Sequence, residues 1–462
     1  MAPHTPQRSA RPGGAVARLD TAPPGRGHTP AARGAPAEPG RPSILRQTMV
    51  PLLIMVGAPV TALLVWHTNV ALGGSLAALA HEIGRQGFVS TILAVWRPVL
   101  LGSPTAWAII GVFVAVQLTL VRLLPGERFN GPTTPTGHVP VYRANGVAAL
   151  AITLALFVGA SYGLGLFSAT IVYDHFGELI GALNVLGLVL CLGLYLKGRL
   201  APSTRDVVVT GNPVRDYFWG TELYPSVAGF SVKQLTNCRF GMMAWPLVLL
   251  SFAAAQQARH GLADSMVIAV ALQLVYIAKF FWWEPGYLRS LDIMHYRAGF
   301  FLCWGCVLWV PTIYTASTLY LVDHPNRFGV PLAAIIAVLG LACIATNYLA
   351  DAQRQRVRAT DGRCLVWGKP PALIRAGGSL LLASGFWGLA RHFHYVPELG
   401  AAFFWTLPAG FAHALPWFYV SFLAVLLVER ALGDDARCAA KYGEAWSEYR
   451  RRVPARIVPG VF

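Results

Sequence analysis

Arg354 and Arg358 stand four residues apart at the end of a long apolar segment and could together hold a phosphate. On a helix, residues at this spacing lie on one face. The planar guanidinium group can bind phosphate through two parallel N–H bonds, which suits a paired arrangement. The same arginines also fit a purely topogenic role, because Lys and Arg accumulate on the cytoplasmic side of membrane segments. The sequence leaves both interpretations open.

A polar tail follows the last apolar segment and mixes cations, rings and carboxylates. The residues of the tail that could contact a ligand are Asp434, Asp435, Arg437, Cys438, Lys441, Tyr442, Trp446, Tyr449, Arg450, Arg451 and Arg452. Rings can stack on a planar group, and guanidiniums can pair with an anion. The tail therefore suits a ligand that is both planar and anionic.

Residues 384–395 crowd Trp387, Arg391, His392 and His394 into a stretch where a lipid-facing helix would carry Leu and Val. Ionisable groups at membrane depth are costly and mark functional sites. The alternative is an interfacial aromatic belt with an arginine that reaches toward water. With the paired arginines and the tail, this segment offers cations for phosphates, rings for stacking and backbone donors, which a dinucleotide needs. The sequence has no G-x-G-x-x-G turn, so a nucleotide would bind between helices and not in a Rossmann domain.

Tyr276, Phe280 and Glu284 recur every four residues and are predicted to line one helical stripe. Tyr276 and Glu284 would each need a polar partner inside the membrane. Cys303 and Cys306 have the spacing of half a zinc site. On an apolar helix without a second pair, a packing role is favoured, and no metal site is predicted.

The elements that must position these residues are membrane helices. The chain of 462 residues is 55% hydrophobic and 13% charged, with a mean hydropathy of +0.51. A soluble chain carries about 25% charged residues, and about 20 apolar residues cross a bilayer. We predict an all-α polytopic membrane protein of about ten transmembrane helices. The predicted spans lie near residues 49–66, 105–124, 145–168, 176–196, 240–256, 263–283, 298–321 and 330–350, with two more between 377 and 428.

The last of these regions is interrupted by Gly385, Gly388, Pro408 and Pro416. We expect short, broken or re-entrant helices there. Such backbone is tolerated at membrane depth only where it is buried in protein or lines a cavity.

Residues 1–48 differ in composition from the rest of the chain. They hold nine Pro, six Gly and seven Arg, and no aromatic residue. They cannot bury enough apolar surface to fold, so a disordered cytosolic tail is predicted. An organelle transit segment is the alternative, because the stretch is rich in Arg and nearly free of acids.

The distribution of basic residues predicts the topology. The connections at 125–143, 197–239, 285–297 and 351–375 each hold at least two Lys or Arg, and the intervening connections are poorer. This alternation predicts that both termini and the 351–375 loop lie in the cytosol. The membrane would be the endoplasmic reticulum in a eukaryote or the inner membrane in a bacterium. The net charge of +16 is then largely topogenic, and nucleic acid is not predicted as a partner.

The tail joins Asp434 to the run from Cys438 to Gly443 and closes on Pro459-Gly-Val-Phe462. In these features it resembles the sterol reductases that act on the Δ14 and Δ7 double bonds. The resemblance is greatest to the Δ7 branch, in particular its plant form. Further stretches that carry it are Tyr142-Arg-Ala-Asn-Gly146, Thr236-Asn-Cys-Arg-Phe-Gly-Met-Met243, Phe280-Phe-Trp-Trp-Glu284, Cys303-Trp-Gly-Cys306 and Ala390-Arg-His-Phe-His-Tyr395. The chain departs from the family pattern at Tyr296 and Gly433, where the family usually has Asp and Arg.

The resemblance implies a transmembrane domain over residues 49–462, with NADPH and a sterol held in a C-terminal pocket. The cofactor part would span about 350–462. The family's proposed proton-donor tyrosine corresponds to Tyr276. We expect Glu284 to act as a supporting charge for it. The cofactor residues that the resemblance implies are Arg354, Arg358, Leu382, Trp387, His394, Tyr395, Asp434, Cys438, Ala439, Ala440, Lys441, Tyr442 and Tyr449.

The implied activity is the NADPH-dependent reduction of a sterol ring double bond, first of all Δ7 of a 5,7-diene, by protonation and hydride transfer. The expected partners are the sterol and membrane lipid. Three alternatives stay open. They are a Δ14-sterol reductase, an isoprenylcysteine-type membrane methyltransferase whose Arg-rich tail grips S-adenosylmethionine, and a non-catalytic sterol-binding protein.

Overall fold

The computed structural model describes residues 44–462. Residues 1–43 of the predicted N-terminal tail lie outside the described residues. The first membrane helix already begins with a π-helical turn, Leu45–Met49, that continues into α1. Helical structure therefore starts a few residues before the boundary that composition predicts.

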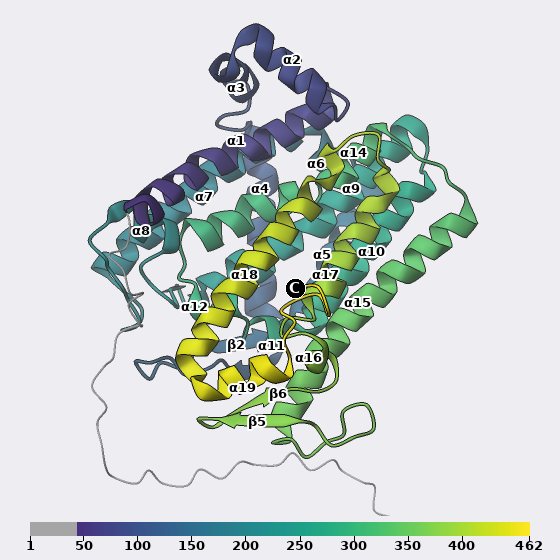
Figure 1. The fold of residues 1–462 in the computed structure, drawn as a ribbon. Helices are drawn as coiled ribbons and strands as arrows, with labels where there is room; N and C mark the ends of the chain where they lie inside the picture. Colours follow the sequence, from purple (N-terminus) through teal and green to yellow (C-terminus); the bar gives the residue numbers. More distant parts are fainter. Residues whose placement is uncertain (1–43) are drawn as a thin grey trace, which may run out of the picture. The chain divides into compact units, whose positions relative to one another are not determined.

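Among the residues that the structure describes, nine helices are long and apolar enough to cross a membrane. This confirms the predicted all-α polytopic class (Figure 1). The nine spans are Gln47–Ala71, Pro104–Leu123, Gly146–Gly163, Phe176–Leu200, Gln234–His260, Asp264–Trp282, Phe300–Asp323, Val330–Ala359 and Leu415–Tyr442.

Most spans combine α-helix with π-helical segments of five to ten residues or with 3₁₀ turns. The α-helices are α1 (Val50–Ala71), α2 (Leu76–Gln86), α3 (Phe88–Trp96), α4 (Pro104–Leu123), α5 (Gly146–Val158), α6 (Ile171–Asp174), α7 (Phe176–Leu200), α8 (Pro213–Trp219), α9 (Met242–His260), α10 (Asp264–Trp282), α11 (Glu284–Tyr287), α12 (Leu291–His295), α13 (Val310–Ile313), α14 (Ala316–Asp323), α15 (Val330–Ala359), α16 (Phe386–Leu389), α17 (Tyr395–Thr406), α18 (Phe418–Tyr442) and α19 (Glu444–Arg452). The π-helical turns are Leu45–Met49, Gly159–Gly163, Gln234–Gly241 and Phe300–Trp309, and the 3₁₀ turns are Leu407–Ala409 and Leu415–Trp417.

The predicted pair of spans between residues 377 and 428 is replaced by one long helix and several short elements. The region opens on a hairpin and contains α16 and α17 before the last span begins. At 12 residues, α17 is about 18 Å long, too short for a hydrocarbon core of about 30 Å. A 3₁₀ turn that contains Pro408 ends it. The broken helices expected from the Gly and Pro residues are therefore present.

Three two-stranded antiparallel hairpins supplement the helices. They are β1 (Glu127–Asn130) with β2 (Val141–Ala144), β3 (Ser226–Val227) with β4 (Phe230–Ser231), and β5 (Leu373–Ala376) with β6 (Ser379–Leu382). The β5–β6 turn consists of Gly377 and Gly378, both with positive φ, as a tight two-residue hairpin turn requires. Ile374 and Leu381 of this hairpin pack against Trp446 of α19 in one apolar cluster.

The predicted stripe of Tyr276, Phe280 and Glu284 does not run along one helix. The α10 helix ends at Trp282, and Glu284 begins the separate short helix α11. Pro285 explains the break, because it has no N–H to continue the hydrogen bonding of α10 and its ring would collide with the preceding turn. Glu284 is thereby turned away from the face of Tyr276.

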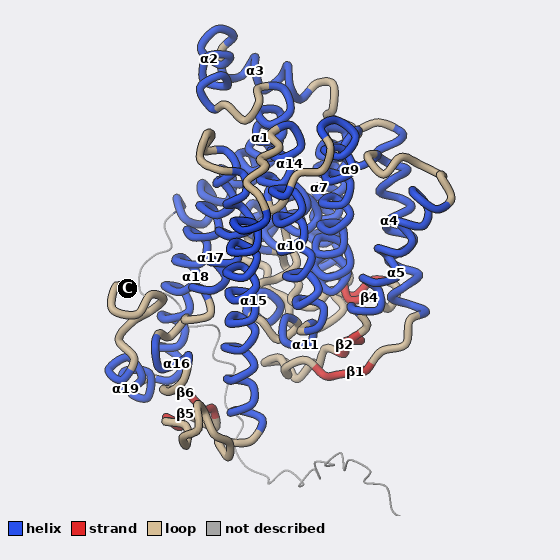
Figure 2. Tube along the Cα trace, turned by 90° about the vertical axis from the view of Figure 1, so that its right-hand side faces the viewer, coloured by secondary structure: helices blue, strands red, loops and turns tan. Residues whose placement is uncertain are grey.

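The C-terminal elements collect around the end of α15. This helix has 30 residues, about 45 Å, so its last turns extend beyond the hydrocarbon core. It packs against α10 and α17, and α17 packs against α18. Figures 1 and 2 show β5, β6, α16 and α19 together at the end of the bundle that is opposite to α2 and α3.

Candidate functional site

A cleft of about 90 Å³ lies where α15, β6, α16, α18 and α19 meet. We call it the α15–α18 cleft. Helical spacing explains its walls, because Arg354 and Arg358 share one face of α15, and residues 434, 438 and 442 share one face of α18. Its lining residues are Arg354, Arg358, Leu380, Leu381, Leu382, Trp387, Arg391, His392, Asp434, Cys438, Tyr442, Trp446 and Tyr449.

Eight of the thirteen cofactor residues implied by the resemblance line this cleft. They are Arg354, Arg358, Leu382, Trp387, Asp434, Cys438, Tyr442 and Tyr449. His394 and Tyr395 lie directly behind it: the His394 ring centroid is 5.0 Å from that of Trp387, and Tyr395 stacks on His392 at 5.4 Å. Ala439, Ala440 and Lys441 are exposed and do not line the cleft.

Trp387 is held from three sides and is only 4% exposed. Its indole Nε1 donates to the Ala350 carbonyl at 2.8 Å, and its own carbonyl accepts from the Tyr449 hydroxyl at 3.0 Å. The Arg354 guanidinium carbon lies 4.0 Å from the centroid of its ring. Gly385 allows the close approach of this segment to α15, because its φ is +62° and a Cβ there would collide with the Gln353 side chain. The ring therefore has a fixed orientation in the cleft.

The two arginines of α15 differ in their pairing. Arg354 is bound to Asp351 through Nη2 at 2.9 Å, and its Nε is buried without a hydrogen-bond partner among the described residues. Arg358 is exposed and lies within 4 Å of no carboxylate in residues 44–462. The cleft therefore has at least one guanidinium that is free to pair with an anion.

The two histidines are neutral at physiological pH. Burial lowers the pKa of His392 to about 4 and that of His394 to about 3, because a charged imidazole loses its hydration there. His392 Nε2 and His394 Nδ1 are both buried and have no hydrogen-bond partner in the described part of the chain. A neutral imidazole can donate or accept. These unpaired atoms, with the cations and the indole, fit the phosphates, amide and rings of a reduced dinucleotide.

Tyr276 belongs to a polar chain that reaches the same region from within the bundle. Its hydroxyl donates to Glu398 Oε1 of α17 at 2.5 Å. Lys279 Nζ lies 4.4 Å from the Tyr276 ring centroid and donates to Asn347 Oδ1 at 2.7 Å. Asn347 Nδ2 donates to the His394 carbonyl at 3.0 Å. Hydrogen bonds and ring contacts thus connect Tyr276 to the segment that carries Trp387.

Aromatic rings surround Tyr276. Its ring centroid is 5.2 Å from that of Trp405 and 6.0 Å from that of Trp245. Tyr314 lies 5.2 Å from Trp245 and 4.4 Å from Tyr419. The faces of such rings stabilise a nearby cation by roughly 0.5–2 kcal/mol each. The surroundings of Tyr276 therefore suit chemistry in which positive charge develops.

Glu284 lies elsewhere, in an ion pair with Arg239. It is 0% exposed, its Oε1 is 2.7 Å from Arg239 Nη1, and its Oε2 accepts from the Gly146 backbone at 2.9 Å. The carboxylate that contacts Tyr276 is instead Glu398, which sequence reasoning missed. Its signal is an acidic residue inside the apolar stretch of α17, the kind of residue that marks functional positions in membrane helices.

Comparison with known proteins gives consistent matches. The profile of the ergosterol biosynthesis ERG4/ERG24 family matches residues 45–462. The chain is 46% identical to a 7-dehydrocholesterol reductase of Arabidopsis thaliana over 426 residues, 89% of this chain and 96% of the relative. It is 37% identical to a 7-dehydrocholesterol reductase of Xenopus laevis over 374 residues, 77% and 79% of the two chains. It is 35% identical to a Delta(14)-sterol reductase of Methylotuvimicrobium alcaliphilum over 418 residues, 89% and 94% of the two chains.

Proposed function

This chain belongs to the ergosterol biosynthesis ERG4/ERG24 family of sterol reductases, and we propose that it reduces the Δ7 double bond of a 5,7-diene sterol with NADPH. Members of the sterol reductase family are oxidoreductases. The observation that carries the proposal is the convergence of Arg354, Arg358, Trp387 and Tyr449 on one cleft at the end of α15. The 46% identity to a plant 7-dehydrocholesterol reductase supports the choice of double bond.

The cleft residues suit separate parts of the cofactor. Arg354 and Arg358 would pair with its phosphates, and Trp387 would offer a fixed ring face to a planar group. His392 Nε2 would supply the hydrogen bond that a buried amide needs. When bound, NADPH supplies the hydride that the sterol accepts.

Reduction of the alkene also requires a proton, because an unactivated carbon cannot hold the negative charge that hydride addition leaves. Protonation of a 5,7-diene at C8 leaves an allyl cation over C5, C6 and C7. Hydride capture at C7 then yields the Δ5 alkene. The protein must therefore provide a positioned acid and a dry cavity that protects the cation from water.

We assign the acid to Tyr276 and propose that Glu398 is the positioning residue behind it. As the hydrogen bond stands, the Tyr276 proton points at Glu398 and not at a substrate. If the Glu398 carboxyl carries a proton, the bond reverses and the Tyr276 proton is released for C8. Proton loss from Tyr276 is then balanced by proton gain from Glu398. The rings of Trp245 and Trp405 would stabilise the cation.

A Δ14-sterol reductase is the second candidate. It is supported by the 35% identity to the bacterial Delta(14)-sterol reductase over most of both chains. Both reactions protonate an alkene and then transfer a hydride to the resulting cation, so the residues discussed above could serve either reaction. The double bond that is reduced depends on how the sterol is held.

We further propose that both termini and the α15–α18 cleft face the cytosol. The excess of Lys and Arg in the connections at 125–143, 197–239, 285–297 and 351–375 supports this orientation. The membrane is the endoplasmic reticulum if the source is eukaryotic and the inner membrane if it is bacterial.

The test is product analysis with the purified chain. The protein, in detergent or nanodiscs, is incubated with NADPH and either 7-dehydrocholesterol or an 8,14-diene sterol, and the sterols are separated by gas chromatography. Conversion of the 5,7-diene to its Δ5 product is expected. Consumption of the 8,14-diene alone would transfer the proposal to Δ14. Failure to reduce either diene would exclude the reductase activity and leave a sterol-binding role or a methyltransferase.

A further inference from the structure

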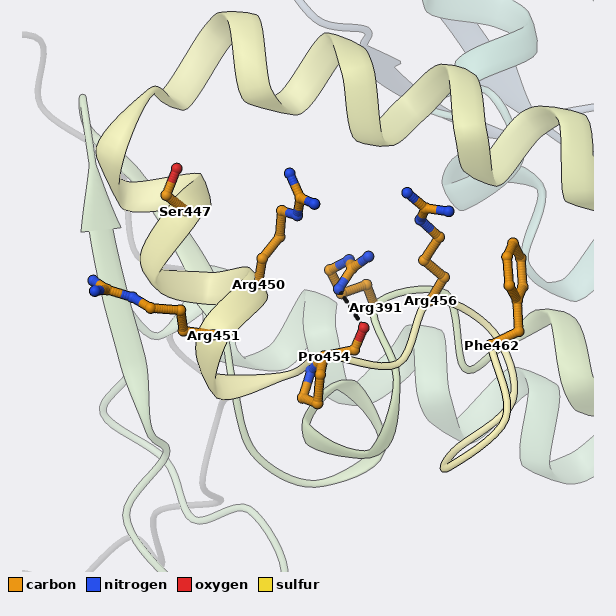
Figure 3. Close-up of a pocket in the computed structure, with 7 residues that line it drawn as sticks. All are labelled: Arg391, Ser447, Arg450, Arg451, Pro454, Arg456 and Phe462. Atoms are coloured by element: carbon orange, nitrogen blue, oxygen red, sulfur yellow. Dashed lines mark hydrogen bonds between the residues drawn. The ribbon is translucent and has the colours of Figure 1, made fainter.

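A second and larger cavity, of about 510 Å³, lies beside the α15–α18 cleft. We call it the arginine pocket. Figure 3 shows the side chains of Arg450 and Arg456 directed into the space beneath α18, with Arg391 between them and bonded to the Pro454 carbonyl, and Arg451 pointing away. Its lining residues are Arg391, Ser447, Arg450, Arg451, Pro454, Arg456 and Phe462.

Three separate segments bring these arginines together. Arg450 belongs to α19, Arg391 follows α16, and Arg456 lies in the loop after α19. The last two segments are joined by backbone hydrogen bonds, from Arg391 N to Ala455 O at 3.0 Å and from His392 N to Arg456 O at 2.7 Å. The fold therefore brings these three arginines together from segments that are not all adjacent in the sequence.

The pocket is short of negative charge. Asp435 contacts Arg391 Nε at 3.3 Å and Arg456 Nη2 at 3.6 Å. No carboxylate of residues 44–462 lies within 4 Å of a guanidinium nitrogen of Arg450 or Arg451. Asp435 is the one side-chain carboxylate of residues 44–462 within 4 Å of these guanidiniums, so Arg450 faces the pocket without an acidic partner.

Local effects account for only part of this charge. Arginines in the last turn of α19 are favoured by the helix dipole, which explains Arg450 and Arg451. Arg391 is 4% exposed and donates through Nη1 to the Val453 and Pro454 carbonyls at 2.7 and 2.8 Å, which fixes it in the wall of the pocket. The dipole of α19 does not explain Arg456, which lies beyond the helix. Burial lowers the pKa of Arg391, and Arg456 and Arg450 lower it further against the opposing effect of Asp435. An anion bound in the pocket would relieve this repulsion.

The two cavities share Arg391. The α15–α18 cleft, at about 90 Å³, is far below the roughly 300–1,000 Å³ of small-molecule sites, and the neighbouring pocket would supply the missing volume. NADPH carries a pyrophosphate and a third phosphate on the adenosine ribose. Arg354 and Arg358 suit the pyrophosphate, so the third phosphate would need a cation beyond them, on the side of Arg391 that the two cavities share.

We propose that the arginine pocket binds a phosphate group, and that this group is the ribose phosphate of the dinucleotide proposed for the adjoining cleft. Arginine is the residue that accommodates this phosphate in other NADP sites. The pocket would then determine the choice of NADPH over NADH. The same chemistry also suits the headgroup of an acidic lipid. The assignment to the cofactor rests on the proposed function, but phosphate binding by the pocket does not.

Arg450→Gln tests the proposal, with Arg452→Gln as the matched control. Both changes remove one charge from α19, but Arg452 does not line the pocket and pairs with Glu448 at 2.5 Å. The full-length chain is placed in phosphatidylcholine nanodiscs, and the dissociation constants of NADPH and NADH are measured by tryptophan fluorescence. In a second arm, nanodiscs contain phosphatidic acid, and native mass spectrometry measures how much of this lipid stays on the protein.

We expect Arg450→Gln to weaken NADPH binding about tenfold or more, the usual effect of losing a hydrogen bond to a charged group, with NADH binding unchanged. If only phosphatidic acid retention falls, the phosphate site stands and its source is lipid. If neither changes, or if Arg450→Gln and Arg452→Gln behave alike, the proposal is overturned. A wild-type chain that binds neither dinucleotide refutes the proposed function, and the lipid arm then decides the pocket alone.

Discussion

Replacement of Tyr276 by Phe removes one oxygen from the centre of the proposed proton path and leaves its surroundings intact. The ring contacts with Trp405 and Trp245 persist, at 5.2 and 6.0 Å, because they do not involve the hydroxyl. The 2.5 Å hydrogen bond to Glu398 is lost. Tyr276 does not line the α15–α18 cleft, so NADPH affinity should not change.

The expected loss of turnover follows from the role of the hydroxyl. A positioned general acid contributes about 10²–10⁴-fold to rate, or roughly 3–5 kcal/mol of barrier. Loss of the hydrogen bond also removes about 1.5–3 kcal/mol of stability, because the half-buried Glu398 carboxylate is left without that donor. Tyr276→Phe should therefore fold, bind NADPH normally and turn over at least a hundredfold more slowly.

The assay compares single-turnover reduction of 7-dehydrocholesterol with NADPH affinity in the same preparation. Tyr320→Phe is the control, because it also removes a buried hydroxyl, one that is 2.9 Å from His413 Nδ1 and outside the proposed proton path. Glu398→Gln, which cannot store a proton, should lower the rate and weaken its pH dependence. Near wild-type turnover of Tyr276→Phe would refute the assignment of the acid. A loss of the same size in Tyr320→Phe would show that the effect is only structural.

Three further perturbations follow from the same structure. Trp387→Leu removes the surface on which Arg354 packs, and NADPH should bind about ten- to a hundredfold more weakly in a fluorescence titration. Burial lowers the pKa of His392 to about 4 from an ordinary value of about 6.5, so the unfolded chain binds more protons between these pH values. The contribution of His392 to stability should be fully present above pH 6.5, and the free energy of unfolding should fall by up to about 3 kcal/mol as the pH drops to 4. The thermal midpoint should therefore fall with pH, and its dependence on pH should be weaker in His392→Asn. Glu284→Gln leaves Arg239 buried without its carboxylate and should cost about 3–5 kcal/mol in the same melting experiment.

Each of these three outcomes has a clear opposite. NADPH binding by Trp387→Leu at wild-type strength would remove the indole from the cofactor site. The same pH dependence in His392→Asn and wild type would mean that His392 does not titrate on unfolding. A Glu284→Gln protein that melts normally but fails to reduce sterol would show that Glu284 takes part in the reaction.

The membrane helices were predictable because a bilayer demands long apolar runs, and eight of the expected spans have counterparts in the structure. The structure of the region after residue 377 was not predictable in this way. Its apolar residues 379–389 suggested a span, but Gly377 and Gly378 form a hairpin turn that doubles β6 back along β5. Apolar composition alone cannot distinguish a short strand packed on α19 from the start of a membrane helix.

The walls of the candidate site followed from helical spacing, which alone predicts that residues 354 and 358 share a face. The side-chain contacts that decide the roles of single residues could not be predicted from the sequence. Glu398 is 122 positions from Tyr276, and Arg239 is 45 positions from Glu284. Such contacts depend on how the helices pack, which no local pattern encodes. Sequence reasoning therefore assigned Glu284 as the supporting charge for Tyr276, whereas the Tyr276 hydroxyl donates to Glu398.

Isotope transfer tests the central claim most directly, since it follows the hydride and the proton separately. The purified chain is incubated with 7-dehydrocholesterol and NADPH deuterated at the transferable C4 position, or with unlabelled NADPH in deuterated water, and the product is examined by mass spectrometry and NMR. The account predicts deuterium at C7 from the cofactor and at C8 from the solvent. Product without cofactor-derived deuterium, or label at C8 from the cofactor, would contradict it.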